Sequence, residues 1–381
     1  MENTWLTSAL WIGLALFSSL ISIRVAISVA LIEIVVGSFA GNLLGLSPNL
    51  WVNYLAGAGA IVLTFLAGAE IDPAIIRKHF WPSVLFGAMG FFVPFFGVLA
   101  YTRFVCGWAW PQAEIAGLAL STTSVAVVYA VMVEAGYNRT EIGKIILAAC
   151  FVNDLGTVFA LGVLFSNLNV WLVLFVVVTA LAMWLLPRFA PWFFKCIGGR
   201  ISEPEIKFIL LVLFFLGGLA ILAGMEAVLP AYLIGMALAP FFLEERIMAQ
   251  RMRVIAFTLL TPFFFLKAGS LVKFGTVASA AVFVLILLGI KIVTKFVGIW
   301  PLTRMFRLKQ REGMYTTLLM CTGLTFGSIC ALVGLTRGII SQDQYTMLVT
   351  AVIVSAVVPT IVAQGWFRPA LPADEEEGNN A

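Results

Sequence analysis

Apolar segments long enough to cross a lipid bilayer follow one another along almost the whole sequence, with only short turns between them. A membrane-spanning helix needs roughly 20 predominantly apolar residues, and the chain contains thirteen such segments. They lie near residues 5–22, 25–44, 51–69, 80–105, 113–134, 141–165, 170–187, 206–223, 227–243, 254–272, 276–300, 313–336 and 344–365. This succession predicts an all-α polytopic membrane protein of about thirteen transmembrane helices, because a helix satisfies its own backbone groups in lipid.

A single membrane domain is expected to occupy residues 1–365, and the acidic segment 366–381 is expected to be a solvated cytoplasmic tail. Only 11% of the 381 residues are charged, whereas a soluble domain carries about 25%, so the lipid bilayer is the expected partner. Segment 5–22 lacks a basic leader and a clear cleavage site, so we interpret it as a retained span. Five cysteines without motif spacing and one histidine indicate neither a disulfide framework nor a zinc site. We expect no cofactor and no nucleic-acid partner.

The distribution of lysine and arginine between the loops predicts the orientation in the membrane. Loops after odd-numbered segments carry 17 of the 23 basic residues, and loops after even-numbered segments carry 3. The remaining three, Lys267, Lys291 and Lys295, lie within or at the edge of segments. This bias predicts a multi-pass protein of the inner (plasma) membrane with its N-terminus outside and its C-terminus in the cytoplasm, and it supports an odd number of spans.

Two segments contain clusters of Ser, Thr and Gly that weaken a regular helix. The fifth contains Ser121, Thr122, Thr123 and Ser124, and the twelfth contains Thr322, Gly323, Thr325, Gly327 and Ser328. Such side chains bond to the backbone groups that a broken helix frees, although small residues also occur where membrane helices pack closely. We predict that both segments are broken helices.

The positions of these two segments indicate an internal repeat. If 170–187 is a linker helix, the chain divides into halves of about 1–165 and 206–365, and each cluster lies in the fifth segment of its half. The first half begins outside the membrane and the second begins inside, so the halves are inverted. Paired broken helices in an inverted repeat are typical of secondary transporters, whose site lies near the midplane.

An amide and a carboxylate, Asn153 and Asp154, stand side by side in the middle of the sixth segment. A charge at the bilayer centre costs roughly 2.5–3.5 kcal/mol on insertion scales, and such residues usually mark ion or proton pathways. Asp154 offers oxygen ligands to a small cation such as Na⁺, and it can bind a proton instead. The alternative is a structural carboxylate paired with a lysine. Asn153 lies about 100° away around a regular helix, so it is either a ligand or a structural hydrogen-bonding group.

Other charged residues in the apolar segments are weaker candidates. Lys291 and Lys295 are four residues apart and share a helix face; two like charges there repel unless one is neutral, paired or snorkelling to the interface. They are the expected partners of buried carboxylates, with snorkelling as the alternative. Glu70 is either a supporting charge or a cap of the following turn. For Glu33, Glu70 and Lys267 a structural role is favoured.

The sequence around these residues resembles the cation:proton antiporter-2 family. This family holds bacterial Na⁺/H⁺ antiporters of the NapA type and Kef-type potassium systems, and it is more distantly related to the NhaA type. The resembling stretches are 64–72, 121–129, 149–157, 229–237, 262–269 and 295–298. Together they are a specific pattern, and the similarity covers essentially all of residues 1–365.

The resemblance implies an NhaA/NapA-like antiporter fold with a dimerisation part, a core part and a homodimeric assembly. It implies transport by an elevator-like shift of the core, with Asp154 as the ion-binding carboxylate and Lys295 as its basic neighbour. Electrogenic members carry two adjacent aspartates where this chain has Asn153 and Asp154, which favours one proton per cation. Kef-type systems often append a nucleotide-binding regulatory domain, which we do not expect in this chain.

We therefore expect a monovalent cation:proton antiporter rather than an enzyme, most simply an electroneutral Na⁺/H⁺ antiporter that serves pH homeostasis, salt tolerance or spore germination. Asp154 would hold either a proton or Na⁺, with oxygens of Asn153, Thr122 or Thr123 as further ligands. Li⁺ and K⁺ also bind to oxygens, so a K⁺/H⁺ antiporter stays an alternative. A cation channel or a Na⁺-coupled symporter would also use an intramembrane carboxylate. No zinc-protease motif and no nucleophile–base pair supports an intramembrane enzyme.

Overall fold

The computed structural model describes residues 4–25, 29–69, 78–134, 137, 140–165, 170–198, 200–223, 225 and 227–369. Within these ranges the regular secondary structure is helical, with no β-strand. Ten helical segments are long and apolar enough to cross a membrane, and two shorter apolar helices, Val29–Leu43 and Val228–Glu244, accompany them. The helix pair interrupted after Ser121 completes thirteen segments in the described part of the chain. The predicted all-α polytopic fold is confirmed.

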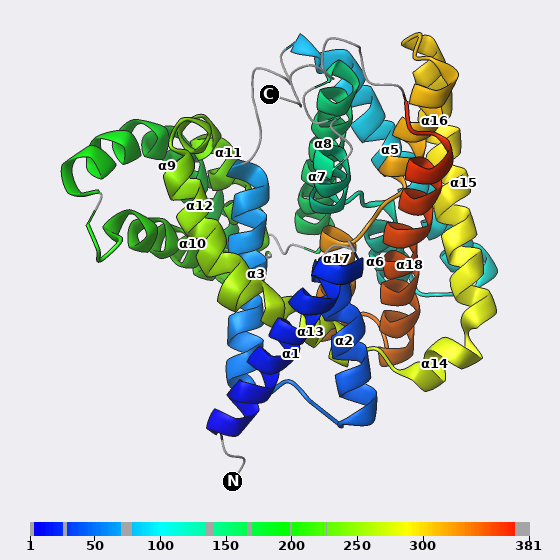
Figure 1. Ribbon diagram of the computed structural model, residues 1–381, viewed down its shortest axis with the longest axis horizontal. Helices are drawn as coiled ribbons and strands as arrows, with labels where there is room; N and C mark the ends of the chain where they lie inside the picture. The colour runs from blue at the N-terminus through cyan, green and yellow to red at the C-terminus, as the bar shows by residue number, and fades with distance from the viewer. Residues whose placement is uncertain are drawn as a thin grey trace. The chain divides into compact units, whose positions relative to one another are not determined.

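The chain forms two compact units that interleave along the sequence: Met1–Pro73 with Val158–Phe274, and Ala74–Thr157 with Gly275–Ala381. The α-helices of the first unit, which Figure 1 labels, are α1 (Thr4–Val25), α2 (Val29–Leu43), α3 (Leu50–Ala69), α9 (Val170–Ile197), α10 (Pro204–Leu222), α11 (Val228–Glu244), α12 (Arg246–Ile255) and α13 (Thr261–Ser270). The π-helical η2 (Ala256–Leu260) lies between α12 and α13. Those of the second unit are α5 (Phe80–Ala100), the π-helical η1 (Tyr101–Val105), α6 (Trp110–Ser121), α7 (Val125–Glu134), most of α8 (Glu141–Phe165), most of the short α14 (Phe274–Ser279), α15 (Ala281–Met305), α16 (Gln310–Met320), α17 (Thr325–Thr336) and α18 (Gln342–Trp366).

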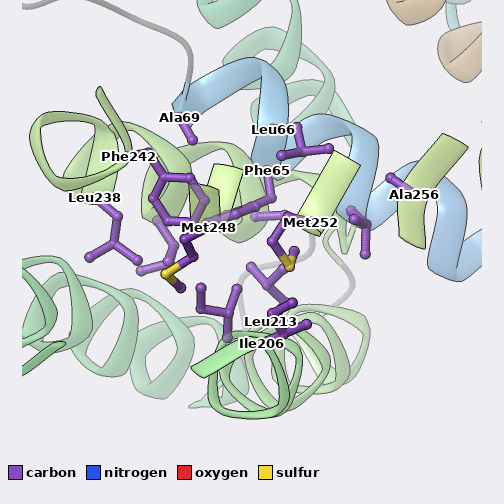
Figure 2. Close-up of a cluster of buried hydrophobic side chains, with 14 of the residues drawn as sticks. Phe65, Leu66, Ala69, Ile206, Leu213, Leu238, Phe242, Met248, Met252 and Ala256 are labelled. Carbon is purple, nitrogen blue, oxygen red and sulfur yellow. The ribbon is translucent and has the colours of Figure 1, made fainter. Parts of the chain in front are cut away.

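The first unit has an apolar core formed by α3, α9, α10, α11 and α12. Figure 2 shows the side chains of Phe65, Leu213, Phe242 and Met252 gathered in one cluster, and all four are buried. The rings of Phe65 and Phe242 meet edge to face, with 5.3 Å between their centroids. Lipid tails are as apolar as these side chains, so it is close packing, more than escape from water, that holds such helices together.

Two glycines let α3 and α11 touch through their backbones. A Cβ atom at Gly68 would lie 2.5 Å from the carbonyl oxygen of Tyr232, and a Cβ atom at Gly235 would lie 2.2 Å from the carbonyl oxygen of Phe65. Both distances are shorter than real Cβ contacts, so only glycine fits this crossing. Small residues of this kind are typical of membrane helix interfaces.

The second unit repeats one arrangement of three membrane-spanning elements. The first trio is α5, the α6–α7 pair and α8, and the second trio is α15, the α16–α17 pair and α18. The offset in residue number from the start of α5 to the start of α15 equals the offset from the start of α8 to the start of α18. The offset from α7 to α17 is shorter by a single position. The two trios therefore keep an almost constant register.

Contacts between α5 and α15 follow the same register. A Cβ atom at Gly97 would lie 2.5 Å from Cγ2 of Thr294, and a Cβ atom at Gly298 would lie 3.2 Å from Cβ of Val93. Counted from the starts of their helices, Gly97 and Gly298 hold the same position. Val93 and Thr294 also hold the same position, so the two contacts are related by the repeat. Residue numbers rise along α5 as they fall along α15, so the helices are antiparallel and the trios form an inverted repeat. The boundaries predicted for two halves of the whole chain stay a prediction.

Candidate ion-binding site

The helices predicted to be broken are both interrupted at their polar clusters. The break between α6 and α7 comprises residues 122–124, and the break between α16 and α17 comprises residues 321–324. The two breaks are joined, because the backbone N–H of Ser124 donates a hydrogen bond to the carbonyl of Thr322 at 2.9 Å. The hydroxyl oxygens of Ser124 and Thr325 lie 3.4 Å apart. Backbone groups freed at one break thus find partners at the other, as buried polar groups must.

Asn153 fixes the first break from the neighbouring helix α8. Its Oδ1 accepts a hydrogen bond from the backbone N–H of Thr123 at 3.0 Å. Its Nδ2 donates to the carbonyls of Ser121 at 3.3 Å and Gly87 at 3.5 Å. Both ends of the amide are therefore occupied by protein groups. Of the two roles expected for Asn153, this geometry favours the structural hydrogen-bonding role over direct ligation.

Asp154 lies next to this network but takes little part in it. The residue is only 2% exposed, and its Oδ1 is buried without a hydrogen-bond partner. Among the ion pairs that the described residues form within 4.0 Å, none includes Asp154. A structural carboxylate paired with a lysine therefore has no support in the geometry. A buried carboxylate oxygen without a partner is costly unless a proton or a cation satisfies it.

Each break has its own buried lysine from α15. Nζ of Lys295 donates to Oγ1 of Thr123 at 2.9 Å, and this hydroxyl in turn donates to the carbonyl of Met320 at 3.0 Å. Nζ of Lys291 donates to Oγ of Ser355 at 2.9 Å. Both lysines are 0% exposed, so the snorkelling alternative is wrong. Neither lysine belongs to an ion pair among the described residues, and hydroxyl groups replace the carboxylate partners that we expected.

Thr122 and Thr322 hold corresponding positions in the two breaks. Each hydroxyl donates to the carbonyl three residues earlier, that of Ala119 at 3.1 Å and that of Leu319 at 2.7 Å. Both threonines are completely buried. A Cβ atom at Gly327 would lie 2.7 Å from the carbonyl oxygen of Ala119, so the second cluster also supplies a close helix contact.

The weaker candidates fall elsewhere. Glu70 lies outside the described residues, as does most of the acidic tail. Glu33 is buried in α2 and Lys267 is half-buried in α13, and both helices belong to the first unit. All the other predicted site residues belong to the second unit. The sequence reasoning missed Ser355, whose signal is that it holds the same position in α18 as Asp154 holds in α8.

Comparison with known proteins matches residues 12–368 to the family described as sodium/hydrogen exchanger, transmembrane. A Na⁺/H⁺ antiporter from Enterococcus hirae is 26% identical over 367 residues, covering 91% of this chain and 94% of the relative. The Na⁺/H⁺-K⁺ antiporter GerN from Bacillus cereus is 24% identical over 351 residues, covering 89% of each chain.

Among solved structures, the sodium proton antiporter MjNhaP1 from Methanocaldococcus jannaschii at pH 8 superposes with a TM-score of 0.69. The match covers 97% of this chain and 100% of that one at 12% sequence identity. At this identity the likeness shows the fold alone, and the fold is the antiporter fold expected from the sequence.

Proposed function

The chain belongs to the transmembrane sodium/hydrogen exchanger family, and from this premise we propose that it exchanges Na⁺ for a proton at Asp154. It is a transporter and not an enzyme. The observation that carries the proposal is the buried, unpartnered Oδ1 of Asp154 beside two joined helix breaks. This carboxylate is the acidic group that the described residues bring to the breaks.

Competition for one carboxylate is enough to couple the two ions. Ionised Asp154 is an acceptor that can hold Na⁺, and protonated Asp154 has lost that charge. Each crossing of the membrane then carries either one Na⁺ or one proton. Asn153 is neutral and has both ends of its amide occupied, so it adds no second acid beside Asp154. One proton for one cation makes the exchange electroneutral.

The further oxygen ligands of the cation are less constrained than Asp154. The hydroxyl of Thr123 is engaged by Lys295 and Met320. The hydroxyl of Thr122 lies on the side of the second break, because its Oγ1 is 3.0 Å from the position that a Cβ atom of Gly323 would take. We therefore propose Asp154 as the charged ligand and leave the choice among the hydroxyl ligands open.

Alternating access is proposed to occur by an elevator-like shift of the second unit. Two features support it: the binding residues all belong to that unit, and the first unit has an apolar core of its own. Such a shift moves one packed body and leaves the site intact. It is the kind of rigid-body transition that inverted-repeat transporters use.

A homodimer in the plasma membrane, with the N-terminus outside, is proposed as the working form. Helix α9 exposes an apolar stripe formed by Val173, Val177, Leu181 and Trp184. Their spacing places them along one helix face, which suits a second copy as well as lipid. K⁺ is the second candidate cation, supported by the similarity to an antiporter named for both Na⁺ and K⁺.

The test is cation-driven proton movement in proteoliposomes that contain a pH-sensitive dye. The variant Asp154→Asn should abolish the movement for Na⁺, Li⁺, K⁺ and Rb⁺ alike. The matched control is Asp343→Asn, the same chemical change at an exposed carboxylate in the first turn of α18, and it should retain exchange. Proton movement that survives in Asp154→Asn would overturn the assignment, and a rate that responds to an imposed voltage would overturn electroneutrality.

A further inference from the structure

We propose that Lys291 is a tethered cation, whose ammonium group fills the counterpart of the Asp154 site in the second trio of helices. This inference rests on the proposed function only for the role of Asp154. It assigns two related cation positions to the second unit, one for an exchangeable ion and one for a side chain of the protein itself.

The register of the repeat identifies the counterpart. Counted from the first residues of α8 and α18, Asp154 and Ser355 hold the same position. Counted in the same way along α5 and α15, Gly90 corresponds to Lys291. One trio thus combines a carboxylate with a glycine, and the other combines a hydroxyl with a lysine. In the first trio the negative charge of Asp154 is paired with a position that has no side chain, Gly90. In the second trio the neutral hydroxyl of Ser355 is paired with the positive charge of Lys291.

The ammonium group of Lys291 has a hydroxyl oxygen as its hydrogen-bond acceptor. Oγ of Ser355 donates its hydrogen to the carbonyl of Val352 at 2.7 Å, so it presents a lone pair to Nζ of Lys291 at 2.9 Å. The same hydroxyl lies 3.4 Å from the carbonyl of Gly323. A buried ammonium group keeps its charge only where such oxygens replace its water.

A glycine of the second break, Gly323, borders the ammonium group of Lys291. A Cβ atom at Gly323 would lie 2.3 Å from Nζ of Lys291, so only glycine leaves room for the ammonium group there. The same missing atom would lie 3.0 Å from both the carbonyl oxygen and Oγ1 of Thr122, which places these oxygens around the same space. In the other trio, the residue that corresponds to Gly323 is Thr123, whose hydroxyl accepts a hydrogen bond from Lys295.

On the side of Asp154, the helix position that corresponds to Lys291 is Gly90, which has no side chain. A Cβ atom at Gly90 would lie 3.3 Å from Cδ1 of Ile299 and 3.3 Å from Cε of Met320, and 3.6 Å from Nδ2 of Asn153, so neighbouring side chains pack closely around this position. The repeat also makes Thr322 the counterpart of Thr122, so it assigns Thr322 as an oxygen ligand beside Asp154. With Lys291 filling the other position, the protein has one exchangeable cation site, in keeping with one cation per cycle.

Chemical replacement of the lysine side chain tests the proposal in the full chain. Lys291→Ala deletes a group with the shape of n-propylammonium. The variant should lose about 5 °C or more in its thermal midpoint in detergent, because buried oxygens are left without their cation. Adding n-propylammonium chloride should restore much of this loss, whereas 1-propanol and NaCl at equal concentration should not. Wild type should show no such response. A response to propylammonium no larger than that of wild type, or equal rescue by 1-propanol, would overturn the proposal.

A second pair of variants decides the matter if Lys291→Ala does not accumulate in the membrane. Ser355→Asp places a carboxylate beside the ammonium group, and Ser355→Asn adds a neutral group of the same size. A charged Lys291 makes the aspartate variant the more stable of the two. The reverse order would contradict a tethered cation at this position.

Both experiments are to be repeated with Asp154→Asn in the same chain. Rescue by propylammonium is expected to persist there, because it does not require cation exchange at Asp154. Loss of rescue in that background would contradict an independent second position. Conversely, exchange that survives in Asp154→Asn would overturn the proposed function and leave the result for Lys291 standing.

Discussion

The two compact units differ in where their buried polar side chains gather. The first packs Phe65, Leu213, Phe242 and Met252 into an apolar cluster. The second buries hydroxyls, an amide, two lysines and a carboxylate around two interrupted helices. In the proposed function, the first unit serves as a scaffold and the second carries the ion-binding site. Stability and ion binding should therefore be separable by mutation.

The largest loss of stability is expected from the apolar cluster. Phe65→Ala removes a ring that packs edge to face on Phe242, and such truncations cost about 3–5 kcal/mol. We expect a much lower thermal midpoint and unchanged apparent affinity for Na⁺ in the protein that still folds. An altered Na⁺ affinity would break the separation of scaffold and site.

A smaller loss is expected at the helix crossing of the first unit. Gly235→Ala places a methyl group against the backbone of α3 and should cost about 1–3 kcal/mol. Gly218→Ala is the matched control, because nothing lies within 4 Å of its added Cβ, and in a helix it should stabilise by up to about 1 kcal/mol. Equal thermal midpoints for the two variants would contradict the close crossing of α3 and α11.

In the second unit, Asn153→Ala should affect the site more than stability. It removes the hydrogen bonds to Thr123 and Ser121. The backbone groups that are left unsatisfied should lower the free energy of unfolding by about 1–3 kcal/mol. The first break then loses its anchor to α8, so the apparent Na⁺ affinity should fall as well. Asn49→Ala, which removes one hydrogen bond to the start of α3, should cost about 1 kcal/mol and leave affinity unchanged. An Asn153→Ala protein with normal Na⁺ affinity would show that the break does not shape the site.

The contrast also explains what could be predicted from the sequence. The helical segments, the two breaks and Asp154 are local features: apolar length, a run of small polar residues, and a carboxylate within an apolar segment. The partners of Lys291 and Lys295 are not local. Ser355 lies 64 residues from Lys291, and Thr123 lies 172 residues from Lys295. Helix periodicity predicts that both lysines share one face of α15. It does not predict that they reach different helix breaks.

The role of Asn153 is left open by the sequence for a physical reason. A helix position tells how far Asn153 and Asp154 diverge around α8, but not which of them meets the broken helix. That depends on how α8 packs against the first break. In the structure the amide meets the backbone of Thr123, and Oδ1 of the carboxylate is left unpartnered.

In the proposed function, one carboxylate, Asp154, exchanges one proton for one cation. The most direct measurement is proton release from the purified protein in weakly buffered detergent solution on addition of Na⁺, compared with the Na⁺ bound at equilibrium. We predict a ratio that approaches one proton per Na⁺ where Asp154 starts protonated, and no release from Asp154→Asn. Two protons per Na⁺, or release that persists in Asp154→Asn, would contradict it.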